Sequence, residues 1–187
     1  MGKLLDQAIV FATKAHEGQC RKGSSTPYIL HPMEAAAIVA TMTMEEAVIV
    51  GAVLHDVVED TPCTIEQIRE LFGEQVAKLV ASESEDKRED LPAHATWKIR
   101  KQETIDHLKT APVEVKMITL GDKLSNIRAM HHDHGVLGDV LWQRFNQKDP
   151  KEHAWYYQSI AQCLAELEKH QAYREYCRLV EETFGAE

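Results

Sequence analysis

The sequence has no long apolar run and no closely spaced cysteines. No uninterrupted apolar stretch approaches the roughly 20 residues that a membrane-spanning helix needs, so we expect no membrane association. The chain also has no CxxC pair. Widely separated cysteines favour the reduced thiols of a cytoplasmic protein over a disulfide framework. The four cysteines are Cys20, Cys63, Cys163 and Cys177.

Positive charge is scarce as well. The 187 residues include 21 Lys+Arg against 30 Asp+Glu, a formal net charge of −9. This balance excludes a broad basic face for nucleic acid, because binding through counterion release needs many Lys and Arg side chains. An anionic small molecule is not excluded, since a local basic cluster or a bound metal reverses the sign within a pocket. We therefore expect a small-molecule partner and no nucleic acid, and the oligomeric state stays open.

Helical periodicity dominates the chain, and no segment alternates apolar and polar residues long enough to predict a strand. The sequence predicts an all-α fold, a helical bundle of about eight or nine helices. We expect a single domain over residues 1–187, with a core over about 1–170 and a C-terminal helix over 171–187. Loops are expected at 18–30, 59–63, 84–94 and 132–150.

Two segments depart from the pattern of a surface helix. EEAVIVGAVLHDVV, at 45–58, is apolar nearly all round, which predicts one central, buried helix. The segment 112–130 has apolar residues on two opposite sides, and Asp122 falls in the middle of one of them. Both expected helices thus carry ionisable groups where packing favours none.

Local signals mark several helix ends. Thr64 and Gln67 have the spacing of a capping box at the start of a short helix, and Gly73 is expected to end it. The histidine-rich segment 131–134 is either a second metal site or a solvated helix C-terminus that ends at Gly135. We favour the helix terminus, because histidines there suit the helix dipole.

His55 and Asp56 lie within the most apolar of the expected helices. A carboxylate buried without partners costs several kcal/mol or more, so Asp56 and Asp122 each need a cation or a donor network. Each is either a satisfied core residue or a metal ligand, and two such carboxylates beside histidines favour a shared divalent cation. His31, just before Pro32 at the expected start of a helix, is a further ligand candidate. Such a mixed set suits Mn²⁺ or Fe²⁺, with Zn²⁺ as an alternative.

Other polar residues lie near these candidates. Glu59 and Asp60 follow one helical turn after His55 and Asp56, where carboxylates orient an attacking water or accept its proton. The alternative is a merely polar end of the helix. Arg21-Lys22 lies in a Gly/Ser-containing loop before His31, where both cations could hold a diphosphate, unless they are a solvated charge pair.

Three segments carry a family resemblance: AHEGQCRKGSSTPYILHP (15–32), HDVVED (55–60) and GDKLSNIRAM (121–130). The set His31, His55-Asp56 and Asp122 resembles the HD metal-dependent phosphohydrolases. Together the segments resemble the hydrolase domain of the RelA/SpoT alarmone enzymes, above all its stand-alone version, the small alarmone hydrolases. The resemblance implies Mn²⁺-dependent removal of the 3′-diphosphate of guanosine tetra- or pentaphosphate, which yields GDP or GTP and pyrophosphate.

The resemblance also implies a role for each matching residue. The implied metal ligands are His31, His55, Asp56 and Asp122. The implied catalytic pair that activates or positions the water is Glu59 and Asp60. The implied substrate-binding residues are Arg21, Lys22, Ser24, Tyr28 and Asn126. Gly121 stands where the family usually has alanine, and we expect this difference only to loosen the packing.

Two alternatives remain at this point. The first is a metal-dependent phosphatase for another nucleotide, such as NADPH or an adenosine alarmone, with the same metal site and a different base pocket. The second is a sensor that binds the nucleotide without turning it over. The intact set of candidate ligands, together with Glu59 and Asp60, favours an enzyme.

Overall fold

The computed structural model describes residues 2–84, 88 and 91–185. Within these ranges the regular secondary structure is helical and includes no strand; an isolated bridge joins Cys20 and Pro27. The predicted all-α class is therefore confirmed. The chain divides into two compact units, Met1–Ser84 with Pro112–Asp122, and Glu85–Ala111 with Lys123–Glu187. The prediction of a single domain stays a prediction.

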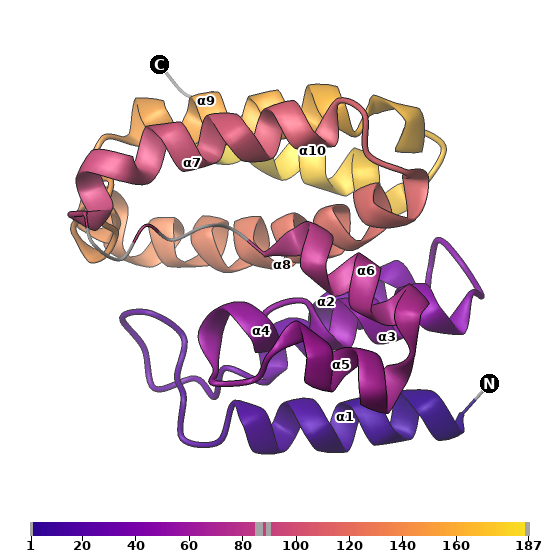
Figure 1. Cartoon of the computed structure of the whole chain (residues 1–187). Helices are drawn as coiled ribbons and strands as arrows, with labels where there is room; N and C mark the ends of the chain where they lie inside the picture. The colour runs from indigo at the N-terminus through magenta and orange to yellow at the C-terminus, as the bar shows by residue number, and fades with distance from the viewer. Residues whose placement is uncertain (1, 85–87, 89–90, 186–187) are drawn as a thin grey trace. The chain divides into compact units, whose positions relative to one another are not determined.

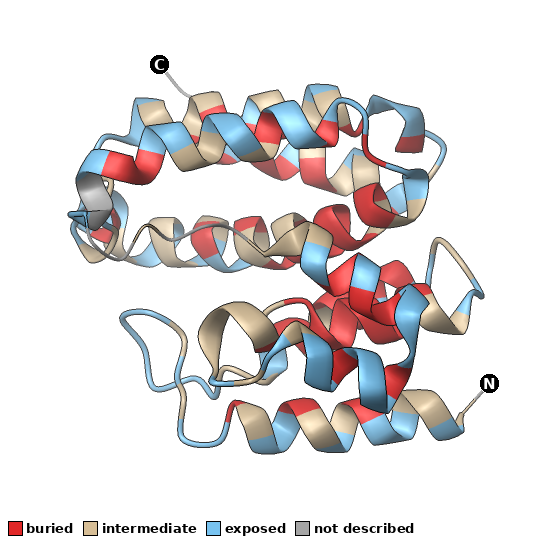
Figure 2. Ribbon diagram, viewed as in Figure 1, coloured by how far each residue is buried: buried red, intermediate tan, exposed pale blue. Residues whose placement is uncertain are grey.

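The first unit is organised around one buried helix, α3 (Figures 1 and 2). Every residue of α3 from Val48 to Leu54 is buried, as its uniformly apolar sequence predicts. Helices α1, α2 and α6 pack against it. The helices of this unit are α1 (Lys3–Ala15), α2 (Leu30–Val39), α3 (Glu46–Leu54), α4 (Val57–Asp60), α5 (Ile65–Phe72), α6 (Glu74–Glu83) and the first part of α8 (Val113–Leu137).

The prediction of one unbroken helix over 45–58 is wrong. Helix α3 ends at Leu54, His55 and Asp56 form a turn, and the four-residue α4 follows. The reason is geometric: successive side chains of a helix point about 100° apart, whereas the side chains of His55 and Asp56 converge on one another, with 3.0 Å between Nε2 and Oδ2. The turn cannot be predicted from hydrophobic periodicity, because Val57, just after it, is also buried and continues the apolar pattern.

The start of α2 differs from the prediction, whereas the start of α5 agrees with it. Helix α2 begins at Leu30, so His31 lies within its first turn rather than ahead of it. Helix α5 begins as predicted, because the Thr64 side chain accepts from the Gln67 backbone N–H at 3.3 Å and the Gln67 side chain accepts from the Thr64 N–H at 2.9 Å. Gly73, with φ of 88°, ends this helix and confirms that signal.

The second unit is built from three long helices and the rest of α8 (Figure 1). Helix α9 packs against both α7 and α10. None of the helices in the described residues has the length and apolar character that crossing a membrane requires. The elements of this unit are α7 (Ala93–Leu108), the 3₁₀ segment η1 (Gly138–Arg144), α9 (Pro150–Cys163), the 3₁₀ segment η2 (Ala165–Leu167) and α10 (Gln171–Phe184).

The predicted loop over 132–150 is wrong for most of its length. Helix α8 continues through Gly135 to Leu137, and η1 follows at once. Tertiary contacts carry the helix past the glycine: the His134 ring lies 5.5 Å from the Trp142 ring, and Arg144 bonds Asp133 at 2.9 Å. Such contacts outweigh the roughly 1 kcal/mol that an internal glycine costs a helix.

Candidate metal centre

Four predicted ligands converge in the first unit, from α2, from the turn after α3 and from α8. His31 Nε2 lies 3.1 Å from Asp122 Oδ1, and His55 Nε2 lies 3.8 Å from the same oxygen. One ligand atom from each of these three side chains lies within 4.8 Å of the others. Asp56 Oδ2 completes the cluster at 3.0 Å from His55 Nε2 and 3.4 Å from His31 Nε2.

The cluster is buried and strongly charged. The side chains of His31 and His55 are 2% exposed, that of Asp122 is 9% exposed and that of Asp56 is 17% exposed. Burial alone would lower the pKa of His55, but the Asp56 and Asp122 carboxylates raise it well above its usual value. Burial alone would raise the pKa of Asp56, but His55 and His31 lower it well below its usual value. The cluster therefore attracts positive charge.

The state of His55 shows that these residues fit a divalent cation. Its Nδ1 lies 2.8 Å from the Ala52 carbonyl oxygen, which only accepts, so Nδ1 carries a proton. Its Nε2 is buried and meets no partner at hydrogen-bonding geometry among the described residues, although two carboxylate oxygens lie nearby. A backbone bond that fixes the tautomer and leaves Nε2 for a metal is the usual second contact of a ligating histidine.

Tyr28 joins the candidate ligands to the predicted catalytic pair. Its hydroxyl oxygen lies 2.7 Å from Asp56 Oδ2 and 3.0 Å from Asp60 Oδ2. Burial raises the pKa of the Tyr28 phenol well above its usual value, and the neighbouring carboxylates raise it further. Tyr28 therefore stays protonated, and its single hydroxyl proton is shared between the two carboxylates. Glu59, also predicted as catalytic, is half-buried in α4.

Apart from Tyr28, the predicted substrate-binding residues fall into two groups. Arg21, Lys22 and Ser24 lie on a tight turn after α1, in which Arg21 N–H donates to the Thr26 carbonyl at 2.8 Å and Ser24 N–H donates to the Arg21 carbonyl at 3.1 Å. Lys22 and Ser24 are exposed there. Asn126 lies one turn after Asp122 on α8, in the part of that helix that belongs to the second unit.

Sequence reasoning missed two residues beside this site, His16 and Gln19. The Gln19 side-chain amide donates to the Asp60 backbone carbonyl at 2.9 Å, and the His16 ring bonds the Gln19 side-chain oxygen at 2.8 Å. Both residues belong to the segment AHEGQ that carries the family resemblance. Nothing in their spacing reveals a bond that spans 41 positions along the chain.

The histidine-rich segment 131–134 does not gather its side chains on one point. His131 bonds Thr183 at 3.1 Å, while His134 lies 3.6 Å from Asp139. Within the described ranges, the one group identified as able to hold a metal ion is His31, His55 and Asp122.

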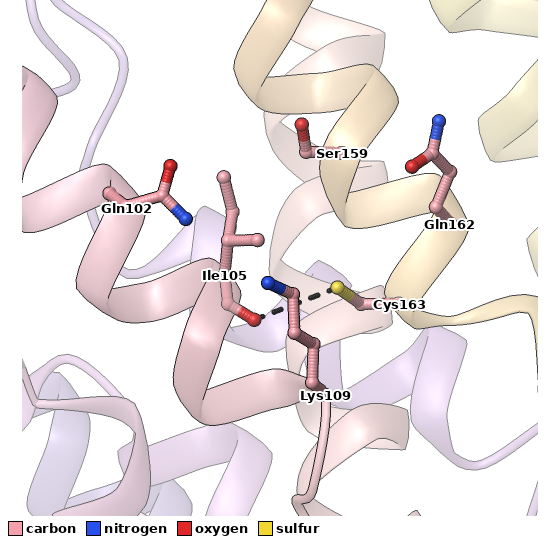
Figure 3. Close-up of a pocket in the computed structure, with 6 residues that line it drawn as sticks. All are labelled: Gln102, Ile105, Lys109, Ser159, Gln162 and Cys163. Carbon is pink, nitrogen blue, oxygen red and sulfur yellow. Dashed lines mark hydrogen bonds between the residues drawn. The ribbon is translucent and has the colours of Figure 1, made fainter.

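A pocket of about 400 Å³ lies in the second unit between α7 and α9 (Figure 3). The Cys163 thiol donates to the Ile105 carbonyl at 3.6 Å within it. The pocket has no histidine or carboxylate in its lining, and its one thiol does not make a metal site. It is lined by Gln102, Ile105, Lys109, Ser159, Gln162 and Cys163.

A match to a known protein family covers the residues of this candidate metal centre. The sequence profile described as "HD domain" matches residues 8–137, which include all four candidate ligands. The chain therefore belongs to the HD domain family.

The chain is also similar in sequence to individual described proteins. Over 131 residues the chain is 38% identical to the "Bifunctional (p)ppGpp synthase/hydrolase SpoT" of Escherichia coli K12, an alignment that covers 68% of this chain and 18% of that protein. The chain thus spans less than a fifth of the length of the curated relatives it matches.

Two solved structures match over nearly their full length. The crystal structure of lmo0812 from Listeria monocytogenes EGD-e superimposes with a TM-score of 0.73 at 34% identity, covering 86% of this chain and 97% of that one. A metazoan protein, described as an ortholog of SpoT that "hydrolyzes ppGpp and plays a role in starvation responses", superimposes with a TM-score of 0.75 at 25% identity. That match covers 99% of this chain and 96% of the metazoan chain.

Proposed function

We propose that this chain is a metal-dependent pyrophosphohydrolase that removes the 3′-diphosphate of guanosine tetra- or pentaphosphate. The products are GDP or GTP and pyrophosphate. The observation that carries the proposal is the buried cluster at His31, His55, Asp56 and Asp122, with one imidazole nitrogen left without a hydrogen-bond partner. Its support is the match over 99% of the chain to a protein described as hydrolysing ppGpp.

The four clustered side chains would hold the metal, Mn²⁺ in this proposal, with Fe²⁺ and Zn²⁺ as alternatives for a mixed nitrogen and oxygen ligand set. Such an ion polarises a phosphoryl oxygen and lowers the pKa of water in its shell. The chain itself supplies a buried, prearranged set of ligands. Ala52 holds the ring of His55, and Tyr28 holds the carboxylate of Asp56.

Glu59 and Asp60 supply the general base of the proposed reaction. The attacking water forms a bond to the phosphorus attached to the 3′ oxygen, and the bond between that phosphorus and the 3′ oxygen breaks. Glu59 or Asp60 accepts the proton of the water, and the 3′ oxygen takes a proton from solvent. The hydrogen bond from Tyr28 restrains the Asp60 carboxylate beside the metal ligands.

The turn that carries Arg21 and Lys22 supplies the positive charge for the phosphates. A guanidinium group matches the geometry of phosphate oxygens, and an ammonium adds a flexible point charge. We assign Ser24 and Tyr28, beside this turn in the first unit, to the nucleoside of the substrate, and Asn126 stays a predicted substrate-binding residue. A cytoplasmic location follows in this proposal, because free guanine nucleotides and reduced thiols are found there.

A substrate panel tests this function. The purified chain is incubated with Mn²⁺ and, separately, with guanosine tetraphosphate, its adenosine analogue and NADPH. The proposal predicts pyrophosphate release from the guanosine compound, with the adenosine analogue and NADPH turned over more slowly. Faster turnover of either competitor would make the chain a phosphatase for another nucleotide. Binding of guanosine tetraphosphate without turnover would make it a sensor.

A further inference from the structure

Helix α4 is too short to hold its own geometry. It has four residues, and its backbone is closed by the bond from the Asp60 N–H to the Asp56 carbonyl at 2.8 Å. The Thr61 hydroxyl adds a bond to the Val57 carbonyl at 2.6 Å. Helices of this length are not stable alone, because nucleation fixes several residues for one hydrogen bond. The position of Asp60 therefore depends on contacts from outside α4.

Gln19 makes such a contact with the backbone at the end of α4. The last carbonyls of a helix have no partner within it, and the Gln19 side-chain N–H₂ donates to the Asp60 carbonyl at 2.9 Å. The base of the Arg21–Lys22 turn holds Gln19 in place, since the Tyr28 N–H donates to the Gln19 carbonyl at 2.9 Å. A half-buried side chain after α1 thus reaches the end of α4.

His16 determines which way the Gln19 amide faces. The Asp60 carbonyl only accepts, so the amide nitrogen of Gln19 faces it and the amide oxygen faces His16 Nδ1 at 2.8 Å. His16 therefore carries its proton on Nδ1 and donates. His16 is 3% exposed and its ring lies 4.9 Å from the ring of Tyr28, so the ring is fixed by packing as well.

We infer that Gln19 is a positioning residue for Asp60 and that His16 fixes the orientation of the Gln19 amide. The inference rests on the proposed function, in which Asp60 is part of the general base. Two bonds from outside α4 reach Asp60, one from Gln19 to its backbone carbonyl and one from Tyr28 to its carboxylate. Loss of one bond displaces the carboxylate without removing it. A small misplacement of a catalytic group costs up to about 100-fold in rate.

Two variants at one position test this inference. Gln19→Glu replaces the donor with an oxygen that faces the Asp60 carbonyl, and Gln19→Met removes both polar groups at similar size. Gln7→Glu is the matched control, because it makes the same charge change at an exposed position of α1. For each protein we would measure kcat and KM with guanosine tetraphosphate, Mn²⁺ affinity by calorimetry, and amide deuterium exchange over residues 57–61.

We expect both Gln19 variants to lose about tenfold or more in kcat, with KM and Mn²⁺ affinity within about threefold of wild type. Amide exchange over 57–61 should accelerate in both, and the control should match wild type throughout. Unchanged kcat and unchanged exchange would overturn the inference, as would a loss confined to Mn²⁺ affinity. If wild type releases no pyrophosphate, the proposed function fails and exchange over 57–61 alone decides whether Gln19 holds α4.

Discussion

His55 is the residue on which the metal assignment depends most directly. Its Nδ1 is bonded to the Ala52 carbonyl, and its Nε2 lies 3.0 Å and 3.8 Å from oxygens of Asp56 and Asp122. The two carboxylates raise the pKa of the ring well above its usual value, because the buried site favours positive charge beside Nε2. A divalent cation supplies that charge and satisfies all three groups together.

Asp122→Asn tests the metal site by replacing one carboxylate oxygen with an amide nitrogen. The substitution removes a charged ligand at nearly constant size, so we expect Mn²⁺ affinity to fall by about 100-fold or more, because losing only a residue that supports a ligand costs roughly 10–100-fold. The rise in Tm on adding Mn²⁺ should vanish with it, because a metal that binds only the folded state at 100 times its Kd adds about 2.7 kcal/mol of stability.

Asp139→Asn, at a side chain 94% exposed, is the control for this substitution. It should bind Mn²⁺ as wild type does in the same calorimetric titration. Wild-type affinity in Asp122→Asn would show that the cluster is not the metal site.

Glu59→Gln separates proton transfer from metal binding. If Glu59 acts as general base, kcat should fall by about 100-fold or more while Mn²⁺ affinity stays near wild type, since general-base catalysis contributes roughly 10²–10⁴ in rate. Steady-state kinetics and a metal titration on one preparation measure both quantities. Glu66→Gln, exposed on α5, controls for the loss of one negative charge. Loss of Mn²⁺ binding in Glu59→Gln would instead make Glu59 a ligand.

At the scale of elements, signals confined to a few neighbouring residues could be predicted from the sequence. The capping box of Thr64 and Gln67 was predicted correctly because both of its bonds lie within one turn. The break at His55 and Asp56 was not predicted, because its cause lies in side chains that meet His31 on α2 and Asp122 on α8. The bond from Gln19 to Asp60 was not predicted either, because the two residues are 41 positions apart.

At Gly121, helix α8 approaches α2 more closely than we expected from the family resemblance. A Cβ at Gly121 would lie 2.7 Å from the Ala35 carbonyl oxygen and 2.9 Å from Val39 Cγ2. The expectation that this glycine only loosens the packing is therefore wrong: the backbone of α2 occupies the space that a methyl group would need. The approach also brings Asp122, the next residue, to His31 on α2.

Gly121→Ala should therefore destabilise the fold. Because the first atom it meets is backbone, relief requires α2 to shift, at a cost of about 1–3 kcal/mol in the free energy of unfolding. Gly135→Ala is the matched control in the same helix, where a Cβ meets nothing within 4 Å. It should raise stability by roughly 0.5–1 kcal/mol, because alanine loses less backbone entropy on folding. Chemical denaturation of both variants measures the difference, and equal effects would contradict the close approach.

For the whole molecule, the net charge of −9 contrasts with the polyanionic substrate that we propose. The charges close to the proposed site explain this contrast. Asp56 and Asp122 would balance the two charges of a divalent ion, and Arg21 and Lys22 add positive charge on one turn of the first unit. That the chain has no broad nucleic-acid face stays a prediction from the net charge, and the net charge says little about a small anion in one pocket.

Lys22→Gln tests this local attraction through its salt dependence. For wild type, KM should rise as ionic strength increases from about 0.01 M to about 0.15 M, because the Debye length falls from about 30 Å to about 8 Å. Lys22→Gln should raise KM at low salt and weaken its dependence on salt. Lys14→Gln, an equal charge change at an exposed position of α1, should keep the wild-type slope. Equal slopes for all three proteins would place the substrate away from this turn.

The central claim is that the His31, His55, Asp56 and Asp122 cluster supports hydrolysis at the 3′-diphosphate. Phosphorus NMR of guanosine tetraphosphate, incubated with the protein and Mn²⁺, tests it most directly because it identifies the bond that breaks. We predict one pyrophosphate and one GDP for each substrate consumed, and no product with Asp122→Asn. Release of orthophosphate, a product that keeps its 3′-diphosphate, or undiminished turnover by Asp122→Asn would contradict the claim.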